Sequence, residues 1–195
     1  MIRRVSWVSL LAAAAFWLFT GLAAAQSQVH MGHITESWGD TPGKVGLLTI
    51  LEQEAKIAAQ HAEYGKGNAA THMPHVRHAI DAASEGGGPG KGYGVIKAAL
   101  GVAAHMKFAA ESPDASEGVK MHSVHVITSA NNVAAWAKQV MEMSKDTSSA
   151  SMAKIADMTK WIVEGHDANG DGKVGWQEGE GGIAQIKQHL GFIQH

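Results

Sequence analysis

The stretch SEGVKMHSVHVITSANNVAAWAKQVMEMS, residues 116–144, decides the fold class of this chain. Apolar residues recur in it at steps of three, four and seven positions, namely Val126, Val133, Trp136, Val140 and Met143. An α-helix has 3.6 residues per turn, so this spacing places them on one side of a helix. The stretch therefore predicts a long helix with one buried face.

The same periodicity extends to both sides of this stretch. It predicts further long helices over about 44–64, 93–111 and 149–165. Shorter helices are expected from Pro74 onward and over about 182–193. Strand-like alternation is not sustained anywhere, so we predict an all-α fold. Its expected form is a bundle of four main helices with a C-terminal helix-loop-helix.

The amino-terminal residues are typical of an export signal. Arg3 and Arg4 precede an uncharged apolar run over 5–22, and three alanines, Ala23 to Ala25, follow it. We predict a signal peptide over 1–25 and a periplasmic or secreted protein without stable membrane insertion after cleavage. The same run is nearly long enough to span a bilayer, so retention as an anchor stays an alternative. The polar segment 26–43 is expected to lack regular structure, and residues 44–195 to form the helical domain.

Composition excludes several classes of function. The chain has 195 residues, no cysteine and a formal net charge of −2. Without cysteine there is no disulfide framework, thiolate zinc site or iron–sulfur cluster. Without a dense basic run there is no electrostatic footprint for nucleic acid. No nucleophile elbow or paired inward carboxylates occur, so we do not expect an enzyme.

One loop has the ligand pattern of a calcium site. It reads DANGDGKVGWQE over residues 167–178. Calcium needs six to eight oxygen ligands, and this loop offers carboxylate or amide oxygens at its first, third, fifth and twelfth positions. The expected ligands are Asp167, Asn169, Asp171, the Lys173 carbonyl and Glu178.

This loop resembles the EF-hand loop, in particular that of bacterial exported EF-hand proteins. The resemblance covers the twelve loop residues, including Gly172 at the sixth position, and the rest of the chain resembles no family known to us. It implies a calcium ion as cofactor. A single exported loop is typical of a structural site rather than of a sensor, which usually works in pairs.

The histidines are the second unusual feature, because the chain contains 12 of them. His72, His75 and His78 follow one another at three-residue steps, as do His122 and His125, which keeps each group on one side of a helix. Imidazole is a preferred ligand of copper, nickel and zinc. We therefore expect helices to converge on one such ion through the bundle histidines His75, His78, His105, His122 and His125.

The sequence thus favours an exported calcium-binding protein that also binds copper, nickel or zinc. Two alternatives stay open. One is a haem-binding electron-transfer bundle with histidine and methionine ligands. The other is a calcium-stabilised module that binds a protein partner, whose identity the sequence does not indicate.

Overall fold

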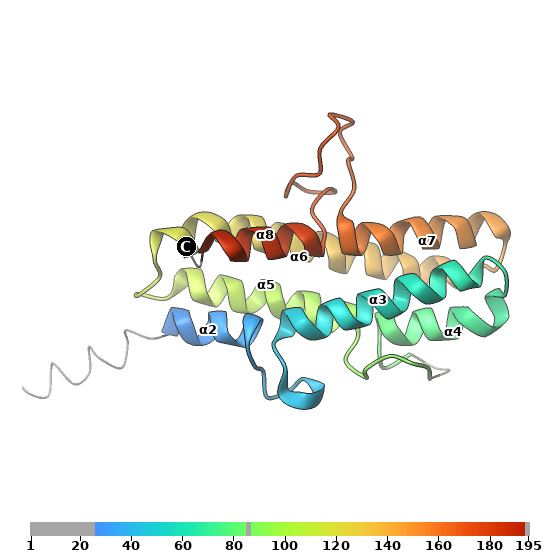
Figure 1. Ribbon diagram of the computed structural model, residues 1–195, viewed down its shortest axis with the longest axis horizontal. Coiled ribbons are helices and arrows are strands. Elements are labelled where there is room, and N and C mark those ends of the chain that lie inside the picture. Colours follow the sequence, from blue (N-terminus) through green and yellow to red (C-terminus); the bar gives the residue numbers. More distant parts are fainter. Residues whose placement is uncertain (1–25, 85–86, 194–195) are drawn as a thin grey trace, which may run out of the picture.

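The computed structural model describes residues 26–84 and 87–193 of the chain. The described part is all-α and contains no strand. The expected signal peptide over 1–25 lies outside it. The helices, labelled as in Figure 1, are α2 (Gln26–Thr35), α3 (Leu47–Gly65), α4 (Ala69–Ile80), α5 (Val95–Glu111), α6 (Glu117–Met143), α7 (Ser149–Glu164), α8 (Ile183–Ile193) and the 3-10 helix η1 (Pro42–Lys44).

The helices form an elongated bundle (Figure 1). The longest helix, α6, extends along much of its length, whereas α2 and α3, α4 and α5, and α7 and α8 follow one another along the same axis. Each short helix packs against a long one: α2 against α5, α4 against α3, and α8 against α6. These three contacts position the candidate site described below.

The predicted apolar face of residues 116–144 is confirmed. Val126, Val133 and Val140 are fully buried, and Trp136 is 7% exposed. The helix begins where the sequence indicates, because the Ser116 hydroxyl accepts a hydrogen bond from the Val119 N–H at 3.2 Å. Burial of this face against α5, α7 and α8 makes α6 the central helix of the bundle.

The amino-terminal segment differs from its prediction. Residues 26–43 were expected to lack regular structure, but they include the ten-residue helix α2. Met31 and Ile34 lie three residues apart on this helix and are buried in the core. Two apolar residues are too weak a signal to predict a helix, and packing against α5 supplies the missing stabilisation.

Helix α4 also begins earlier than expected. Pro74 lies inside it, and the helix starts at Ala69, where the Asn68 side chain accepts a hydrogen bond from the Thr71 N–H at 3.2 Å. An asparagine cap satisfies one of the free N–H groups of the first turn. The earlier start brings His72 into the helix, one turn before His75.

The connection between α4 and α5 is held by one buried carboxylate. Glu54 on α3 is fully buried, and its Oε1 accepts hydrogen bonds from the N–H groups of Tyr93 at 2.9 Å and Gly94 at 3.0 Å. Its Oε2 accepts a third from the Lys91 N–H at 2.9 Å. This glutamate therefore fixes the start of α5 to the middle of α3.

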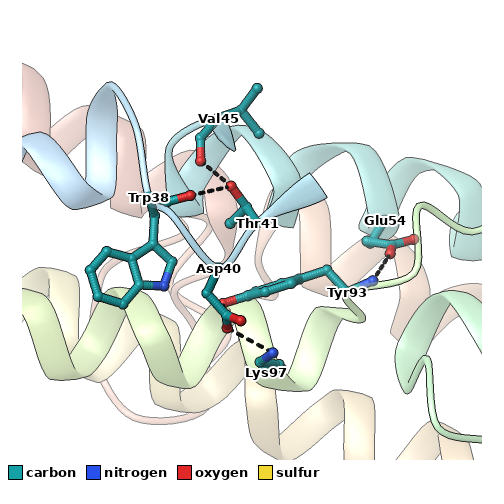
Figure 2. Close-up of polar contacts among 7 residues, drawn as sticks. All are labelled: Trp38, Asp40, Thr41, Val45, Glu54, Tyr93 and Lys97. Atoms are coloured by element: carbon teal, nitrogen blue, oxygen red, sulfur yellow. Dashed lines mark hydrogen bonds and ion pairs between the residues drawn. The ribbon is translucent and has the colours of Figure 1, made fainter. Parts of the chain in front are cut away.

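The connection between α2 and α3 is tied to the same region (Figure 2). The Asp40 carboxylate contacts the Lys97 ammonium at 2.8 Å and accepts a hydrogen bond from the Tyr93 hydroxyl at 3.2 Å. The Thr41 hydroxyl donates to the carbonyl of Trp38 at 2.9 Å. These contacts hold the loop that carries the Trp38 ring.

A search of the described residues for a helix that is both long and apolar enough to cross a membrane finds none.

Replacement of Glu54 by glutamine should lower the free energy of unfolding by about 1–3 kcal/mol. The amide would turn a donor toward backbone N–H groups that need an acceptor, in a site without access to water. Chemical denaturation measures the change. Glu117→Gln is the matched control, because the Glu117 side chain is 88% exposed, and it should change stability by less than about 0.5 kcal/mol. Equal losses in the two variants would contradict this role of Glu54.

Candidate metal centres

Three clusters of histidines lie at the contacts between short and long helices. Each cluster contains three imidazoles whose ring nitrogens lie within 4.8 Å of one another. We name them by their helices: the α2–α5 triad (His30, His33, His105), the α3–α4 triad (His61, His72, His75) and the α6–α8 triad (His122, His125, His189). Each triad could hold a transition metal ion.

In each triad one imidazole faces the other two through its Nδ1 atom. The Nδ1 of His105 lies 3.0 Å from that of His30 and 3.4 Å from that of His33. In the α3–α4 triad, His61 lies 2.9 Å from His72 and 3.3 Å from His75 by the same atoms. The α6–α8 triad repeats the arrangement.

The Nδ1 of His189 lies 3.1 Å from that of His122 and 3.2 Å from that of His125. Hydrogen bonding alone satisfies only part of this arrangement. An imidazole Nδ1 has either one N–H or one lone pair, so the shared nitrogen bonds well to only one of its two neighbours. A metal ion accepts a lone pair from all three.

The spacing of the nitrogens also fits a metal ion. Imidazole nitrogens bind zinc at about 2.0–2.1 Å, and a tetrahedral arrangement at that distance separates them by roughly 3.3 Å. The distances from the shared Nδ1 atom to its two neighbours run from 2.9 to 3.4 Å in the three triads. In each triad, two of the three nitrogen–nitrogen distances therefore match those between ligands of one zinc ion, and all three nitrogens lie within 4.8 Å of one another.

The three triads share a sequence pattern as well as a geometry. One helix supplies two histidines three residues apart, and the facing helix supplies the third. Three residues after that third histidine stands an aromatic residue, in every case about half exposed: Tyr64, Phe108 and Phe192.

Each of these aromatic rings packs on the first histidine of the facing pair. The ring centroids are 5.2 Å apart for Phe108 and His30, 5.3 Å for Tyr64 and His72, and 5.4 Å for Phe192 and His122. The near equality of these distances shows that the triads are three copies of one local arrangement. An apolar ring beside the ligands also limits access of water to the nitrogens.

The second histidine of each pair lies against a connection between helices. Trp38, in the α2–α3 connection, has its ring centroid 4.5 Å from that of His33. Trp176, in the α7–α8 connection, stacks on His125 at 4.1 Å. A Cβ atom added to Gly88, in the α4–α5 connection, would lie 3.0 Å from Cδ2 of His75, so the backbone passes directly against that ring.

The environment of the shared histidines favours the neutral form that binds metal. Burial, together with the neighbouring His33 and His30, lowers the pKa of His105 to about 4. Burial, together with His125 and His122, lowers the pKa of His189 to about 4. The pKa of His61 is lowered by the same two effects. A neutral imidazole keeps a lone pair for a cation, so these nitrogens are ready to bind at neutral pH.

The structure places the five histidines proposed from the sequence in different parts of the bundle. His75, His105 and the pair His122 and His125 belong to three different triads. The expectation that they converge on one ion is therefore wrong. His78 is in none of the triads found in the described residues, and its Nδ1 is buried without a hydrogen-bond partner.

Five triad members were not proposed as metal ligands from the sequence: His30, His33, His61, His72 and His189. The available signal was a pair of histidines three residues apart together with a distant histidine followed by an aromatic residue at the third position. His30 and His33 have the pair spacing but lie in the segment that was expected to be irregular. Met73 and Met106, next to triad histidines in the sequence, belong to the hydrophobic core.

The loop over 167–178 is stabilised by its own acidic side chains. The Asp167 carboxylate accepts hydrogen bonds from the N–H groups of Gly170 at 2.7 Å, Asp171 at 3.1 Å and Gly172 at 2.9 Å. Gly172 has a φ of 82°, which only glycine adopts without strain. Its position is the one where an EF-hand loop turns sharply.

Two carboxylates at the end of this segment, Glu178 in the loop and Glu180 just after it, differ in their surroundings. Glu178 is exposed beside Asn131 and Asn132 of α6, and Lys173 is exposed. Glu180 is 4% exposed, and its carboxylate accepts hydrogen bonds from the Gly175 N–H at 2.9 Å and the Asn169 side chain at 2.6 Å. Within the two described ranges, the loop carboxylates do not form a three-ligand cluster like those of the histidines.

No family model matches the chain, and neither a curated protein nor a solved structure matches it.

Without bound metal, the protein should lose stability as the pH falls from about 6.5 toward 4. The folded His105 and His189 have pKa values of about 4, below the ordinary value of 6.5. The unfolded chain therefore binds more protons in this range, which favours unfolding. Thermal melts of the metal-free protein at about pH 7.5 and about pH 5 measure the loss. The variant His105→Gln/His189→Gln should show a smaller loss, and an unchanged pH dependence in it would refute the assignment.

Proposed function

We propose that this protein binds three transition metal ions, one in each histidine triad, and serves to store, buffer or deliver them. The observation that carries the proposal is the threefold repetition of one local arrangement: a histidine pair, a facing histidine and an aromatic ring. A single cluster of histidines can arise from packing alone. Three clusters in which the same atoms face one another are explained if each cluster binds a metal ion.

The ligand chemistry favours copper, nickel or zinc. All donors in the triads are imidazole nitrogens, which suit these borderline ions, and hard ions such as calcium prefer oxygen. The triads use different pairs of helices, so each ion would be bound separately. Such an arrangement suits binding and release of several ions.

The binding of metal would also stabilise the bundle. Each triad joins a short helix to a long one, and the short helices have only 10 to 12 residues. Helices of this length are marginal by themselves in water. An ion held by both helices of a contact would therefore fix the short helix in place.

We further propose that the loop over 167–178 binds a calcium ion as a structural support. The sequence pattern of Asp167, Asn169 and Asp171 supports this, as does the sharp turn at Gly172. The export signal expected over 1–25 supports a periplasmic or secreted location, where calcium is plentiful and transition metals must be managed.

Elemental analysis should find three equivalents of zinc after loading at about pH 7.5 and dialysis, one for each triad. Each of the variants His105→Ala, His61→Ala and His189→Ala removes the shared nitrogen of one triad and should lower the count by one. The triple variant should retain no tightly bound zinc.

The control for this experiment is His78→Ala. His78 lies on α4 close to the α3–α4 triad in sequence but outside it in space, so its removal should leave three equivalents bound. A count that falls in this control, or that stays at three in the triad variants, would show that the metal binds elsewhere.

Calcium should raise the melting temperature of the protein, and Asp167→Ala should abolish the rise. A ligand present at 100 times its dissociation constant stabilises the folded state by about 2.7 kcal/mol. Differential scanning fluorimetry with and without millimolar calcium measures the effect, with Asp157→Ala, an exposed acid on α7, as control. Comparison of Glu178→Ala with Glu180→Ala identifies the carboxylate that completes the site. An unchanged melting temperature of the unaltered protein would refute calcium binding.

A further inference from the structure

The α6–α8 triad differs from the other two in what covers it. Trp176 stacks on His125 with ring centroids 4.1 Å apart and planes 28° from parallel. Trp176 belongs to the loop over 167–178, the candidate calcium loop. Trp176, whose ring contacts the candidate ligand His125, thus belongs to the same loop as the candidate calcium ligands.

The loop is fixed to the helix that carries His125. Asn132 lies seven residues after His125, two helical turns along the same face of α6. Its side-chain amide donates hydrogen bonds to the carbonyls of Gln177 at 2.8 Å and Gly181 at 3.3 Å, and its carbonyl accepts one from the Gly179 N–H at 3.0 Å. These bonds fix the backbone directly after Trp176 to α6.

The loop is also continuous with the helix that carries the third ligand. It leads directly into α8, where the Gln185 side chain accepts a hydrogen bond from the Gly182 N–H at 2.9 Å. His189 stands one turn further along α8. The loop therefore contacts both helices of the triad, α6 through Asn132 and Trp176 and α8 through the chain itself.

We propose that Trp176 is a positioning residue through which calcium in the loop controls the metal affinity of the α6–α8 triad. This inference rests on the proposed function of both sites. Calcium would order the loop from Asp167 to Gly175, and the ordered loop would hold the Trp176 ring against His125. An imidazole already held in its binding orientation costs less to order when the metal arrives, so calcium raises the affinity. Linkage requires the reverse effect too: metal in the triad raises the affinity for calcium by the same factor.

The other two triads provide internal controls. The ring of Trp38 covers His33 of the α2–α5 triad, but its connection is held by contacts of Asp40 with Tyr93 and Lys97 (Figure 2). The α3–α4 triad is covered by the glycine-rich connection at Gly88. Neither connection belongs to the calcium loop, so calcium should act on one triad of the three.

The test uses full-length variants that retain one triad each. His61→Ala/His105→Ala retains the α6–α8 triad, and His105→Ala/His189→Ala retains the α3–α4 triad. Zinc affinity is measured by competition with a chromophoric chelator, in calcium-free buffer and with millimolar calcium. We expect calcium to raise the affinity of the first variant by at least about fivefold, the lower end of typical coupling between sites, and to leave the second unchanged.

Substitutions of Trp176 then identify the residue responsible. In the variant that retains the α6–α8 triad, Trp176→Ala should abolish the calcium effect while calorimetry still detects calcium binding. Trp176→Phe keeps an aromatic ring and should restore most of the effect, whereas Trp38→Ala should not alter it. Circular dichroism verifies that each variant is folded.

Each possible result has a distinct meaning. Equal calcium effects in the two single-triad variants would overturn the inference, because they would reflect general stabilisation. Calcium binding without any change in zinc affinity would overturn it while both proposed sites stand. Absence of calcium binding would overturn it together with the calcium part of the proposed function. Absence of zinc binding in both folded single-triad variants would refute the proposed function itself.

Discussion

The packing of this bundle depends on one contact that occurs three times, in which an imidazole nitrogen of one helix faces two imidazole nitrogens of another. In every triad the shared nitrogen faces two others at 2.9 to 3.4 Å, although hydrogen bonding can satisfy only one such contact. The arrangement exists because a short helix packs on a long one and brings one histidine opposite a pair. The packing of α2, α4 and α8 and the geometry of the candidate metal centres are therefore one feature.

The connections between helices also contact the triads. Three of them join helices that follow one another along the same axis (Figure 1), and each one covers the second histidine of a triad pair, through Trp38, Gly88 or Trp176. An interruption of a helix exposes backbone groups and costs stability. Glu54 and Asn132 offset part of this cost, because their side chains bond to the backbone of two of the connections.

The sequence predicted the long helices and α8 well, and the short helices α2 and α4 less well. Val126, Val133 and Val140 were correctly placed in the core, because a helix of many turns repeats its apolar signal several times. In α2, only Met31 and Ile34 give that signal, so its helical structure depends on packing against α5. Pro74 indicated a helix start, but the cap at Asn68 outweighed it. Local sequence signals were therefore a weak guide to these two helices.

The sequence by itself determined the all-α class, the face of α6 that is buried and the kinds of ligand available: imidazole in abundance, no thiolate and one oxygen-rich loop. It also contained the spacing of each histidine pair, since residues three apart share a face of a helix. Only the tertiary structure decided which histidine stands opposite which pair. His105 is 72 residues from His33, and His189 is 64 residues from His125. Contacts between residues so far apart in the sequence depend on how the helices pack, and no local pattern in the chain specifies that packing.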